Sequence, residues 1–452
     1  LLVVAVSASA DDASSRDAPT GDTLSGDALV ETFFDLGSTD ASEAREAVRD
    51  VRDAWHPGFA PMSLEIARVA GPEARKRILR MLERQTGERL GSDLDDWWQW
   101  VWSHPSADHP SYPLFKSRLY RLLDARFGDY FDVERSHTIR LDEVRWGGVQ
   151  QDGIPPLRSP KMIGADEATY LDDDHVVFGL EVDGDARAYP KRILAWHEMF
   201  TDTLAGIPMA GVYCTLCGTM ILYETTDARG VEHRLGTSGF LYRSNKLMYD
   251  QATQSLWSTI EGEPVIGPLV GRGIQLRHRA VVTTTWGAWR QRHPETKVLS
   301  LDTGHERDYS EGAAYRQYFA TDELMFTVPR IDDRLANKAE VLALDLDHAD
   351  HPPLAIAVAY LREHPIVHEQ LGEQRVVVLT DGSGASRVYA SDQVRFASWD
   401  DESGVVDTTG DRWRLDEAGL HHTDGRTLAR LPAHRAFWFG WSAVHADTRL
   451  VR

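Results

Sequence analysis

The sequence predicts a multidomain α+β protein, with an N-terminal α-helical, HEAT-like module followed by a β-rich domain built from two internal repeats. Three observations lead to this prediction: a helical period over residues 28–130, strand-like runs after residue 135, and a pattern W-x-x-W-x-x-x-H-x-x-T that occurs twice. At 452 residues and 42% hydrophobic content, the chain is long enough for two or three domains with sizeable cores.

The first residues predict export. Residues 1–10 are mainly apolar and end in Ala8-Ser9-Ala10, which resembles the end of a truncated secretory signal peptide. Residues 11–27 are mostly Asp, Ser, Ala, Gly and Thr, the composition of a disordered acidic linker. We therefore expect an exported protein, periplasmic or extracellular, with a mature chain that starts near Asp11. No later run has the length of a membrane span, so we expect no transmembrane segment in the mature chain.

Residues 28–130 predict the helical module. Apolar side chains recur there at helical spacing, and Gly, Pro and Asp separate the periodic stretches. Amphipathic helices are predicted over residues 41–55, 72–85, 94–103 and 112–127. Short helices interrupted in this way are typical of the stacked helical hairpins of an α-solenoid, which is the basis of the HEAT-like prediction.

Residues 135–452 predict the β-rich domain and its duplication. Residues 285–296 and 437–448 share the tryptophan, histidine and threonine pattern, and Leu194-Ala195-Trp196-His197 aligns with Leu361-Arg362-Glu363-His364. Each of the latter segments is followed by an apolar run and then a glycine-containing turn. The predicted parts are repeat one at about 175–300, a connection at 301–339, and repeat two at 340–452.

Cys214 and Cys217 are the only cysteines, and they stand in Tyr213-Cys214-Thr215-Leu216-Cys217-Gly218 between two strand-like runs. This context predicts the turn of a β-hairpin, with Gly218 at the position that needs a positive φ. In such a knuckle, backbone N–H groups point at the sulfur and stabilise a thiolate ligand. No helical run follows Cys217, so a thioredoxin-type site is not indicated. The second repeat has no cysteine, so we expect the chemistry in the first.

The leading hypothesis is an exported metal-binding protein, with a metalloenzyme as one form of it. Two sulfurs do not complete a tetrahedral site, and His197 is the nearest candidate for a third ligand, with Glu198 or Asp202 to orient its ring. A copper or zinc ion suits sulfur and imidazole ligands. His197 has a counterpart in His364, which a shared packing role would also explain.

Two other classes of function stay open. One is a thiol/disulfide protein with a structural or redox bridge between Cys214 and Cys217. The other is a non-catalytic interaction protein that binds partners through its helices. Metal content and free-thiol counts would distinguish these classes.

Four further side chains are candidates for a pocket beside the cysteines: Tyr213, Ser238, Asn245 and Asp250. Ser238 stands in Thr237-Ser238-Gly239, which is not the G-x-S-x-G elbow of the hydrolases. A catalytic serine is therefore not indicated.

The charge of the chain excludes one class of partner. With 70 acidic against 49 basic side chains, the formal net charge is −21, which repels nucleic acid. The expected partner is a small molecule or a protein of unknown identity.

Short motifs between residues 150 and 450 resemble the prokaryotic domain-of-unknown-function family 3179. They are Asp152-Gly153-Ile154-Pro155, Ala188-Tyr189-Pro190, Trp196-His197-Glu198, Tyr213-Cys214-x-x-Cys217-Gly218, Ser255-Leu256-Trp257, His293-Pro294 and Asp302-Thr303-Gly304. The cysteines and His197 match the family's motif, whereas His305 stands where the family pattern leads us to expect tyrosine. The resemblance implies family membership and no particular activity.

Overall fold

The computed structural model describes residues 25–104, 108–346, 351–400 and 404–452. It divides into two compact units, one reaching to Val144 and including Ile266–Pro268, and one formed by Arg145–Val265 and Leu269–Arg452. The predicted signal-peptide segment and nearly all of the predicted linker lie outside the described residues. Within the described ranges, no helix is long and apolar enough to cross a membrane.

The first unit is helical, as predicted. Its elements are α1 (Gly26–Leu36), α2 (Ala41–Asp53), α3 (Phe59–Val69), α4 (Pro72–Thr86), α5 (Leu94–Ser103), α6 (Tyr112–Arg121), α7 (Phe127–Tyr130) and the 3₁₀ turn η1 (Leu141–Glu143). Local signals set the helix ends: Asp40 accepts the backbone N–H of Ser42 (2.7 Å) at the start of α2, and Gly87 ends α4 in the left-handed conformation. The buried ion pair of Glu65 and Lys116 lies in the core of this unit.

The second unit is rich in β-structure. The elements up to residue 299 are β1 (Val144–Trp146), β2 (Leu157–Arg158), β3 (Met162–Gly164), η2 (Ala165–Glu167), β4 (Val176–Val182), β5 (Asp185–Pro190), α8 (Lys191–His197), β6 (Met199–Leu204), β7 (Ile207–Cys214), β8 (Thr219–Glu224), β9 (Leu235–Tyr242), β10 (Asn245–Asp250), β11 (Leu256–Ser258), β12 (Pro264–Ile266), β13 (His278–Arg279), β14 (Val282–Thr285), α9 (Trp286–Arg292) and β15 (Lys297–Leu299). They form three five-stranded sheets in the orders β1-β9-β10-β11-β12, β13-β8-β7-β6-β2 and β14-β4-β5-β15-β3.

The remaining elements belong to the connection and the C-terminal half of this unit. They are α10 (Arg316–Phe319), β16 (Glu340–Leu344), β17 (Leu354–Ala357), α11 (Val358–Glu363), β18 (Ile366–Leu371), β19 (Gln374–Thr380), β20 (Ser386–Ala390), β21 (Phe396–Asp400), β22 (Gly404–Asp407), β23 (Arg412–Leu415), β24 (Gly419–His422), β25 (Thr427–Leu431), β26 (His434–Phe437), α12 (Trp438–Val444) and β27 (Arg449–Val451). The sheet β18-β19-β20-β25-β24-β23-β22-β21 is a nearly closed barrel, and its edge strands β18 and β21 approach where Phe396 N–H donates to His368 Nε2 (3.0 Å).

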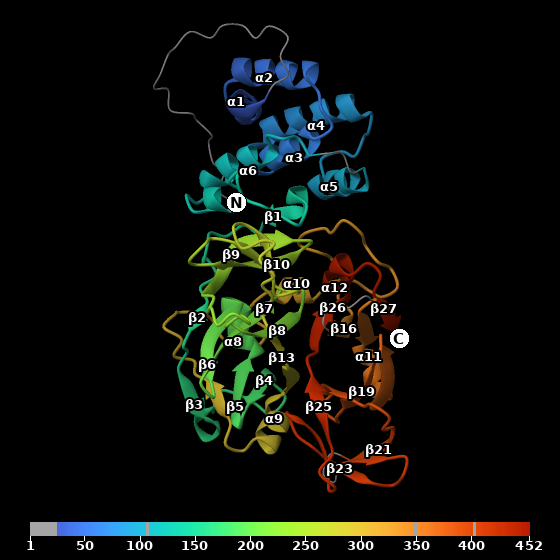
Figure 1. The fold of residues 1–452 in the computed structure, drawn as a ribbon. Coiled ribbons are helices and arrows are strands. Elements are labelled where there is room, and N and C mark those ends of the chain that lie inside the picture. The colour runs from blue at the N-terminus through green and yellow to red at the C-terminus, as the bar shows by residue number, and fades with distance from the viewer. Residues whose placement is uncertain (1–24, 105–107, 347–350, 401–403) are drawn as a thin grey trace. The chain divides into compact units, whose positions relative to one another are not determined.

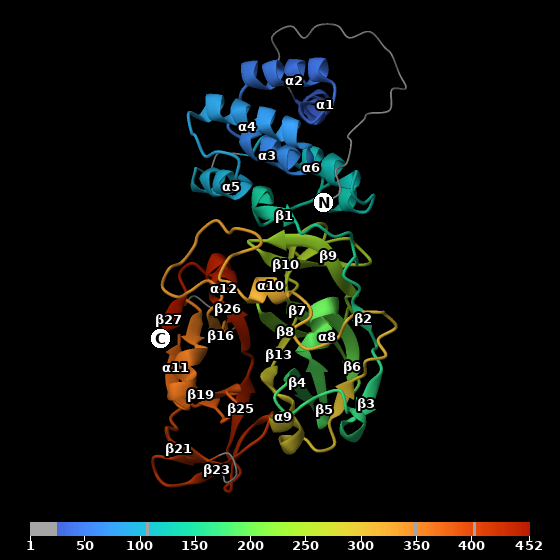
Figure 2. The ribbon, with the colours of Figure 1, turned by 180° about the vertical axis from the view of Figure 1, so that it is seen from behind.

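The two halves of the second unit have a sheet topology in common. The order β14-β4-β5-β15 corresponds to β26-β16-β17-β27, and in each sheet two pairs are antiparallel and the last pair is parallel. In each half a short helix follows the second strand of the hairpin, α8 after β5 and α11 after β17. Figures 1 and 2 show the two halves side by side, the first mainly green and the second orange to red.

The repeated tryptophan pattern makes the same local contacts in both halves. Trp289 Nε1 donates to Thr296 Oγ1 (2.9 Å), and Trp441 Nε1 donates to Thr448 Oγ1 (3.0 Å). Each tryptophan also stacks on the histidine four residues later, with ring centroids 4.0 Å and 4.1 Å apart. These agreements are what a duplication requires, and descent from one duplicated unit stays a prediction.

One hydrophobic cluster joins the halves. It contains Val212 and Trp257 from the first half, and Ala343, Trp438 and Trp441 from the second. Burial of these large side chains stabilises the contact between the halves. The cysteine turn lies beside this shared core.

Candidate functional site

The cysteines lie in the turn of the predicted hairpin. Strand β7 ends at Cys214, β8 begins at Thr219, and these two residues face each other as an antiparallel pair. Gly218 has a φ of +61°, and a Cβ there would lie 2.9 Å from the ring of Phe437. The turn therefore requires glycine at this position both for its conformation and for space.

A second hairpin contacts both sulfurs. Strands β9 and β10 are joined by Arg243 and Ser244, two non-glycine residues with φ of 47° and 65°. This tight turn brings the carbonyl oxygen of Ser244 to 3.1 Å from Cys217 Sγ, which donates to it. The backbone N–H of Lys246, in the same hairpin, acts to lower the pKa of both thiols. Left-handed conformations of non-glycine residues are costly and are often found at functional sites.

The second half of the unit closes the other side of the turn. The backbone N–H of Phe437 in β26 donates to the carbonyl oxygen of Cys217 (2.7 Å). At Gly440 in α12, a Cβ would lie 3.0 Å from Cys217 Cβ. Asn245 Nδ2 donates to the Gly440 carbonyl oxygen (2.8 Å). The cysteine turn is thus held between the β9–β10 hairpin of the first half and the β26–α12 segment of the second.

A buried charge pair lies beside the thiols. The Glu198 carboxylate forms an ion pair with the Lys246 ammonium, and the side chains are 6% and 8% exposed. Glu198 Oε1 also accepts hydrogen bonds from Thr215 Oγ1 (2.6 Å) and from the Tyr315 hydroxyl (3.1 Å). Because a buried carboxylate needs compensation, this arrangement fixes the ammonium of Lys246 next to the cysteine turn.

The two thiols differ in acidity. Burial and the Glu198 carboxylate oppose ionisation of Cys214, but the neighbouring Cys217 thiol and the backbone N–H and ammonium of Lys246 outweigh them, so the pKa of Cys214 lies below its ordinary value. Burial, together with the hydrogen bond to Cys214 and the charge there, raises the pKa of Cys217 well above the ordinary value. The first proton therefore leaves Cys214, and Cys217 keeps its proton.

The surroundings of the sulfurs are otherwise apolar. Cys214 is 3% exposed and Cys217 is fully buried. They belong to a hydrophobic cluster that includes Leu216, Phe326 and Phe439. Bulk solvent is excluded from the thiols, so a reagent that reaches them without rearrangement of the site must be small.

His197, the predicted third ligand, uses both ring nitrogens elsewhere. Nδ1 donates to the carbonyl oxygen of Pro155 (2.9 Å), and Nε2 therefore accepts the hydroxyl proton of Tyr309 (2.6 Å). The Tyr309 oxygen lies 2.7 Å from Thr303 Oγ1. Across the described ranges, no group of three or more His, Cys, Asp or Glu side chains is arranged to hold a metal ion.

Burial has a direct consequence for the titration of His197. Desolvation lowers the pKa of His197 to about 4 from its ordinary 6.5, against the opposing effect of the Pro155 carbonyl. In the unfolded chain the ring binds a proton near pH 6.5, whereas in the folded protein it does so only near pH 4. The free energy of unfolding therefore falls as the pH falls through this window.

We expect a variant H197Q to lose less stability than the wild type between pH 6.5 and pH 4.5. The difference in slope should approach 1.4 kcal/mol per pH unit at most, the contribution of about one proton. Urea unfolding at several pH values measures it. The exposed neighbour His305, whose ring lies 5.1 Å from that of His197, supplies the control H305Q, which should keep the wild-type slope. Equal slopes in all three proteins would refute the assignment.

The four predicted pocket residues separate into two pairs. The Tyr213 hydroxyl is buried with no hydrogen-bond partner among the described residues, and burial, then the nearby Cys214, raises its pKa well above the ordinary value. Tyr213 and Asn245 therefore lie with the cysteines. Ser238 Oγ donates to the Leu247 carbonyl oxygen (2.6 Å), and Asp250 accepts from Thr253 Oγ1 (2.7 Å). These two bonds support a strand pair and a turn, and a pocket role for Ser238 and Asp250 stays a prediction.

Sequence reasoning gave no role at the cysteines to Lys246, Thr215, Tyr315 or Tyr318. Tyr318 donates from its hydroxyl to the Leu216 carbonyl oxygen (2.7 Å), and Lys338 Nζ lies 3.4 Å from the centre of its ring. Tyr315 and Tyr318 come from the connection between the halves, far from the cysteines in the chain. The only local signal was that Lys246 directly follows the predicted pocket residue Asn245 in the chain.

Comparison with known proteins identifies a family but no characterised relative. The family model described as "Protein of unknown function (DUF3179)" matches residues 151–448, which is well over half of the chain. No curated protein and no solved structure matches the chain. The match covers both hairpins that hold the cysteines and both halves of the second unit, and the chain belongs to the DUF3179 family of proteins of unknown function.

Proposed function

We propose that Cys214 and Cys217 form a reversible disulfide and that the second unit is a redox-responsive protein. The observation that carries the proposal is the pair of buried thiols in one turn, with the Cys217 sulfur donating to the Ser244 carbonyl oxygen of the β9–β10 hairpin. The opposite pKa shifts of the two thiols support the proposal. The lowered pKa of Cys214 favours the nucleophilic thiolate, whereas Cys217 stays protonated until it attacks the oxidised Cys214.

Because the two thiols are buried, the oxidant must be small, and hydrogen peroxide is one such oxidant. The ionised Cys214 sulfur bonds to one peroxide oxygen, the O–O bond breaks, and the hydroxide that leaves takes up a proton to become water. The Cys217 sulfur then bonds to the Cys214 sulfur, and the S–O bond breaks. The second hydroxide takes the Cys217 proton. Overall, two thiols are oxidised to a disulfide and one peroxide is reduced to two waters.

An external dithiol reverses the reaction. Its thiolate attacks the bridge, its second thiol resolves the mixed disulfide, and the cysteines return as thiols while the external pair becomes a disulfide. Because the Cys217 carbonyl oxygen accepts the N–H of Phe437, a change at this turn acts directly on the contact between the two halves. Export of the chain, predicted from residues 1–10, is part of this proposal, since disulfides persist in oxidising compartments.

A second candidate is a copper or zinc site at the same sulfurs. The backbone N–H of Lys246, which stabilises a thiolate at Cys214, favours it. Copper(I) is satisfied by soft thiolate ligands, so Cys214 and Cys217 alone suit it, whereas zinc needs further ligands. For His197 to serve as a third ligand, its ring would have to give up the hydrogen bonds to Pro155 or Tyr309.

One experiment separates these candidates. The protein is purified with reductant and without chelator, its metal content is measured, and its free thiols are counted before and after equimolar peroxide and again after dithiothreitol. We expect no stoichiometric metal. We also expect that peroxide removes two free thiols and that dithiothreitol restores them. Stoichiometric copper or zinc that protects the thiols would establish the metal site instead. Thiols that stay inert in metal-free, folded protein would refute both candidates and leave the non-catalytic interaction protein.

A further inference from the structure

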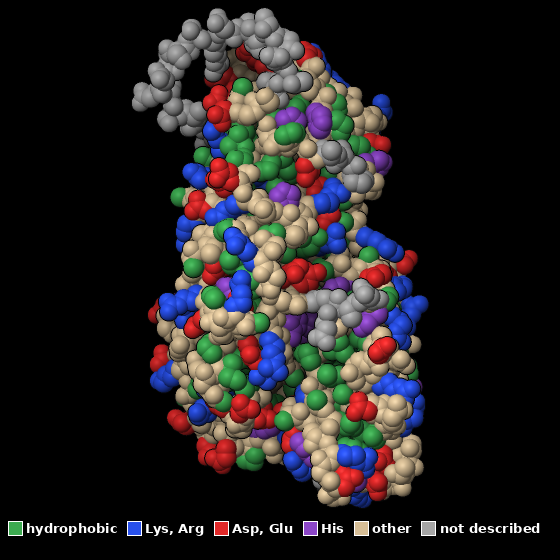
Figure 3. Space-filling model, in the orientation of Figure 1, with side chains coloured by type: hydrophobic (Ala, Val, Ile, Leu, Met, Phe, Trp, Pro, Cys, Tyr) green, Lys and Arg blue, Asp and Glu red, His purple; other side chains and the backbone are tan. Residues whose placement is uncertain are grey.

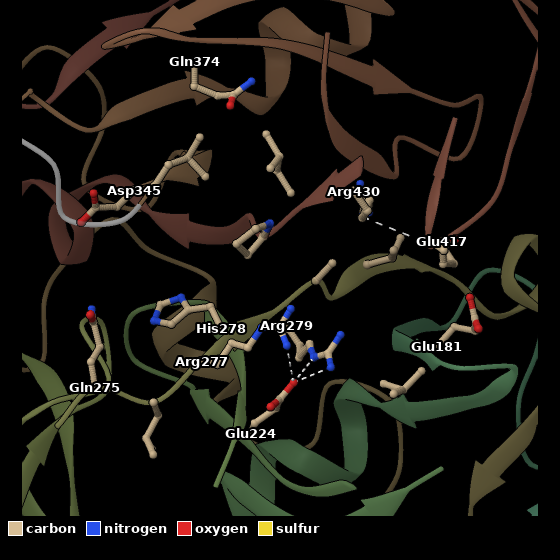
Figure 4. Close-up of a pocket in the computed structure, with 18 of the residues that line it drawn as sticks. Glu181, Glu224, Gln275, Arg277, His278, Arg279, Asp345, Gln374, Glu417 and Arg430 are labelled. Atoms are coloured by element: carbon tan, nitrogen blue, oxygen red, sulfur yellow. Dashed lines mark hydrogen bonds and ion pairs between the residues drawn. The ribbon is translucent and has the colours of Figure 1, made fainter. Parts of the chain in front are cut away.

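A second site, separate from the cysteine turn, opens between the two halves of the second unit. A cavity of about 1240 Å³ is lined by β4, β8, β13 and β14 of the first half and by β25 and the ends of β16 and β18 of the second. Figure 4 shows side chains of the two halves facing each other across it, with His278 and Arg279 on one side and Asp345 and Gln374 on the other. The cysteine turn contributes no residue to its described lining.

The described lining of the cavity is acidic. It contains seven carboxylates against three guanidinium groups. Glu224, Asp227 and Glu417 pair with arginines, and the remaining excess of acid favours a cation. The guanidinium groups already have anionic neighbours: Arg277 and Arg279 pair with Glu224, and Arg430 lies 3.9 Å from Glu417. On the face seen in Figure 3, acidic and basic side chains are interspersed, and the chain as a whole also carries an excess of acid.

A small recess adjoins the cavity. It has a volume of about 10 Å³, the space of one water-sized group, and shares His278, Arg279, Asp345 and Pro432 with the larger cavity. His434 lines the recess and is 7% exposed, and its Nε2 has no hydrogen-bond partner among the residues that the structure describes. A buried polar atom without a partner is costly, and a bound ligand would satisfy it.

The state of His434 decides what the recess accepts. Burial, followed by the neighbouring His278 and His445, lowers the pKa of His434 to about 3. The ring is therefore neutral near pH 7 and can offer a nitrogen lone pair. A primary ammonium group has the size of a water molecule and three N–H donors, which suits an imidazole nitrogen beside the Asp345 carboxylate.

We propose that this cavity binds a linear aliphatic polyamine, with one terminal ammonium group in the recess at His434 and Asp345. The remaining ammonium groups lie along the carboxylates of the cavity, of which Glu181 is one. Aliphatic side chains such as Val182, Leu276 and Leu431 also line the cavity, and they suit the methylene segments of such a ligand. The described lining has no Phe, Tyr or Trp on which a sugar or a nucleobase would stack.

Calorimetric titration of the whole protein with spermidine in 0.15 M salt tests the proposal. We expect one binding site, at least 10-fold weaker binding in D345N, and a smaller loss of affinity in E181Q. The control D166N removes the same charge from an exposed side chain outside the cavity and should leave the affinity unchanged. Butylamine, with a single ammonium group, should bind far more weakly than spermidine.

Four results would overturn the proposal. They are the absence of spermidine binding, an equal loss of affinity in D345N and D166N, tighter binding of a trilysine peptide than of spermidine, and stoichiometric zinc binding that displaces spermidine. If thermal unfolding shows that D345N does not fold, E181Q carries the test, and an affinity equal to that of the wild type in E181Q would then contradict it.

Discussion

Replacing Cys214 with serine is expected to abolish both disulfide formation and the rapid reaction with peroxide. The reason is that Cys214 is the thiol that ionises first, while the pKa of Cys217 is raised by burial and by its neighbour. The matched variant C217S keeps the nucleophile and should stop at sulfenic acid, because the resolving thiol is missing. Mass spectrometry after peroxide and a sulfenic-acid trap measures both outcomes. A reactive C214S protein beside an inert C217S protein would reverse the assigned roles.

Replacing Lys246 with methionine is expected to lower the free energy of unfolding by about 3–5 kcal/mol, because the buried Glu198 carboxylate loses its counter-charge. The same variant should raise the pKa of Cys214, so that the reaction with peroxide requires a higher pH. Urea unfolding under reducing conditions gives the first quantity, and the pH dependence of the oxidation rate gives the second.

The double variant E198Q/K246M is the control for the charge pair. It removes both charges and should recover most of the lost stability. Because the Glu198 carboxylate raises the pKa of Cys214, its removal should also bring this pKa back toward the wild-type value. A loss below 1 kcal/mol in K246M, with an unchanged pH dependence, would show that this ion pair neither stabilises the site nor acts on the thiols.

The helices that could be predicted are those with one apolar face. The period of residues 94–103 gave α5 with the bounds found in the structure, where the Asp93 side chain caps the helix by accepting the backbone N–H of Asp95. Helix α3 was not among the predicted helices, because its residues from Phe59 to Ala67 are buried on every side, including Ser63 and Glu65. A helix without a polar face lacks the periodic signal on which the prediction depends.

The cysteine hairpin could be predicted because its signals are local. Two strand-like runs flank the cysteines, and Gly218 directly follows Cys217. A few consecutive residues therefore suffice to predict the turn. The partners of the site could not be predicted, since they come from other elements: Lys246 from β10, Tyr315 from the connection and Phe437 from β26. No spacing rule relates residues that meet only through the packing of separate sheets.

The contacts of His197 could not be predicted from the sequence for the same reason. Its place beside tryptophan and glutamate made it the nearest imidazole to the cysteines in the chain, and hence a candidate ligand. The contacts that occupy its ring come from Pro155 and Tyr309, which lie in loops on either side of it in sequence. Its role as a ligand stays a prediction that the metal analysis decides.

The most direct test is an equilibrium redox titration of the folded wild-type protein in dithiothreitol buffers, with the state of Cys214 and Cys217 read by mass spectrometry after alkylation. The account predicts a single reversible two-electron transition between the dithiol and an intramolecular disulfide, with the protein folded in both states. Two free thiols at every ratio of oxidised to reduced dithiothreitol would contradict the account. Oxidation that dithiothreitol does not reverse would also contradict it.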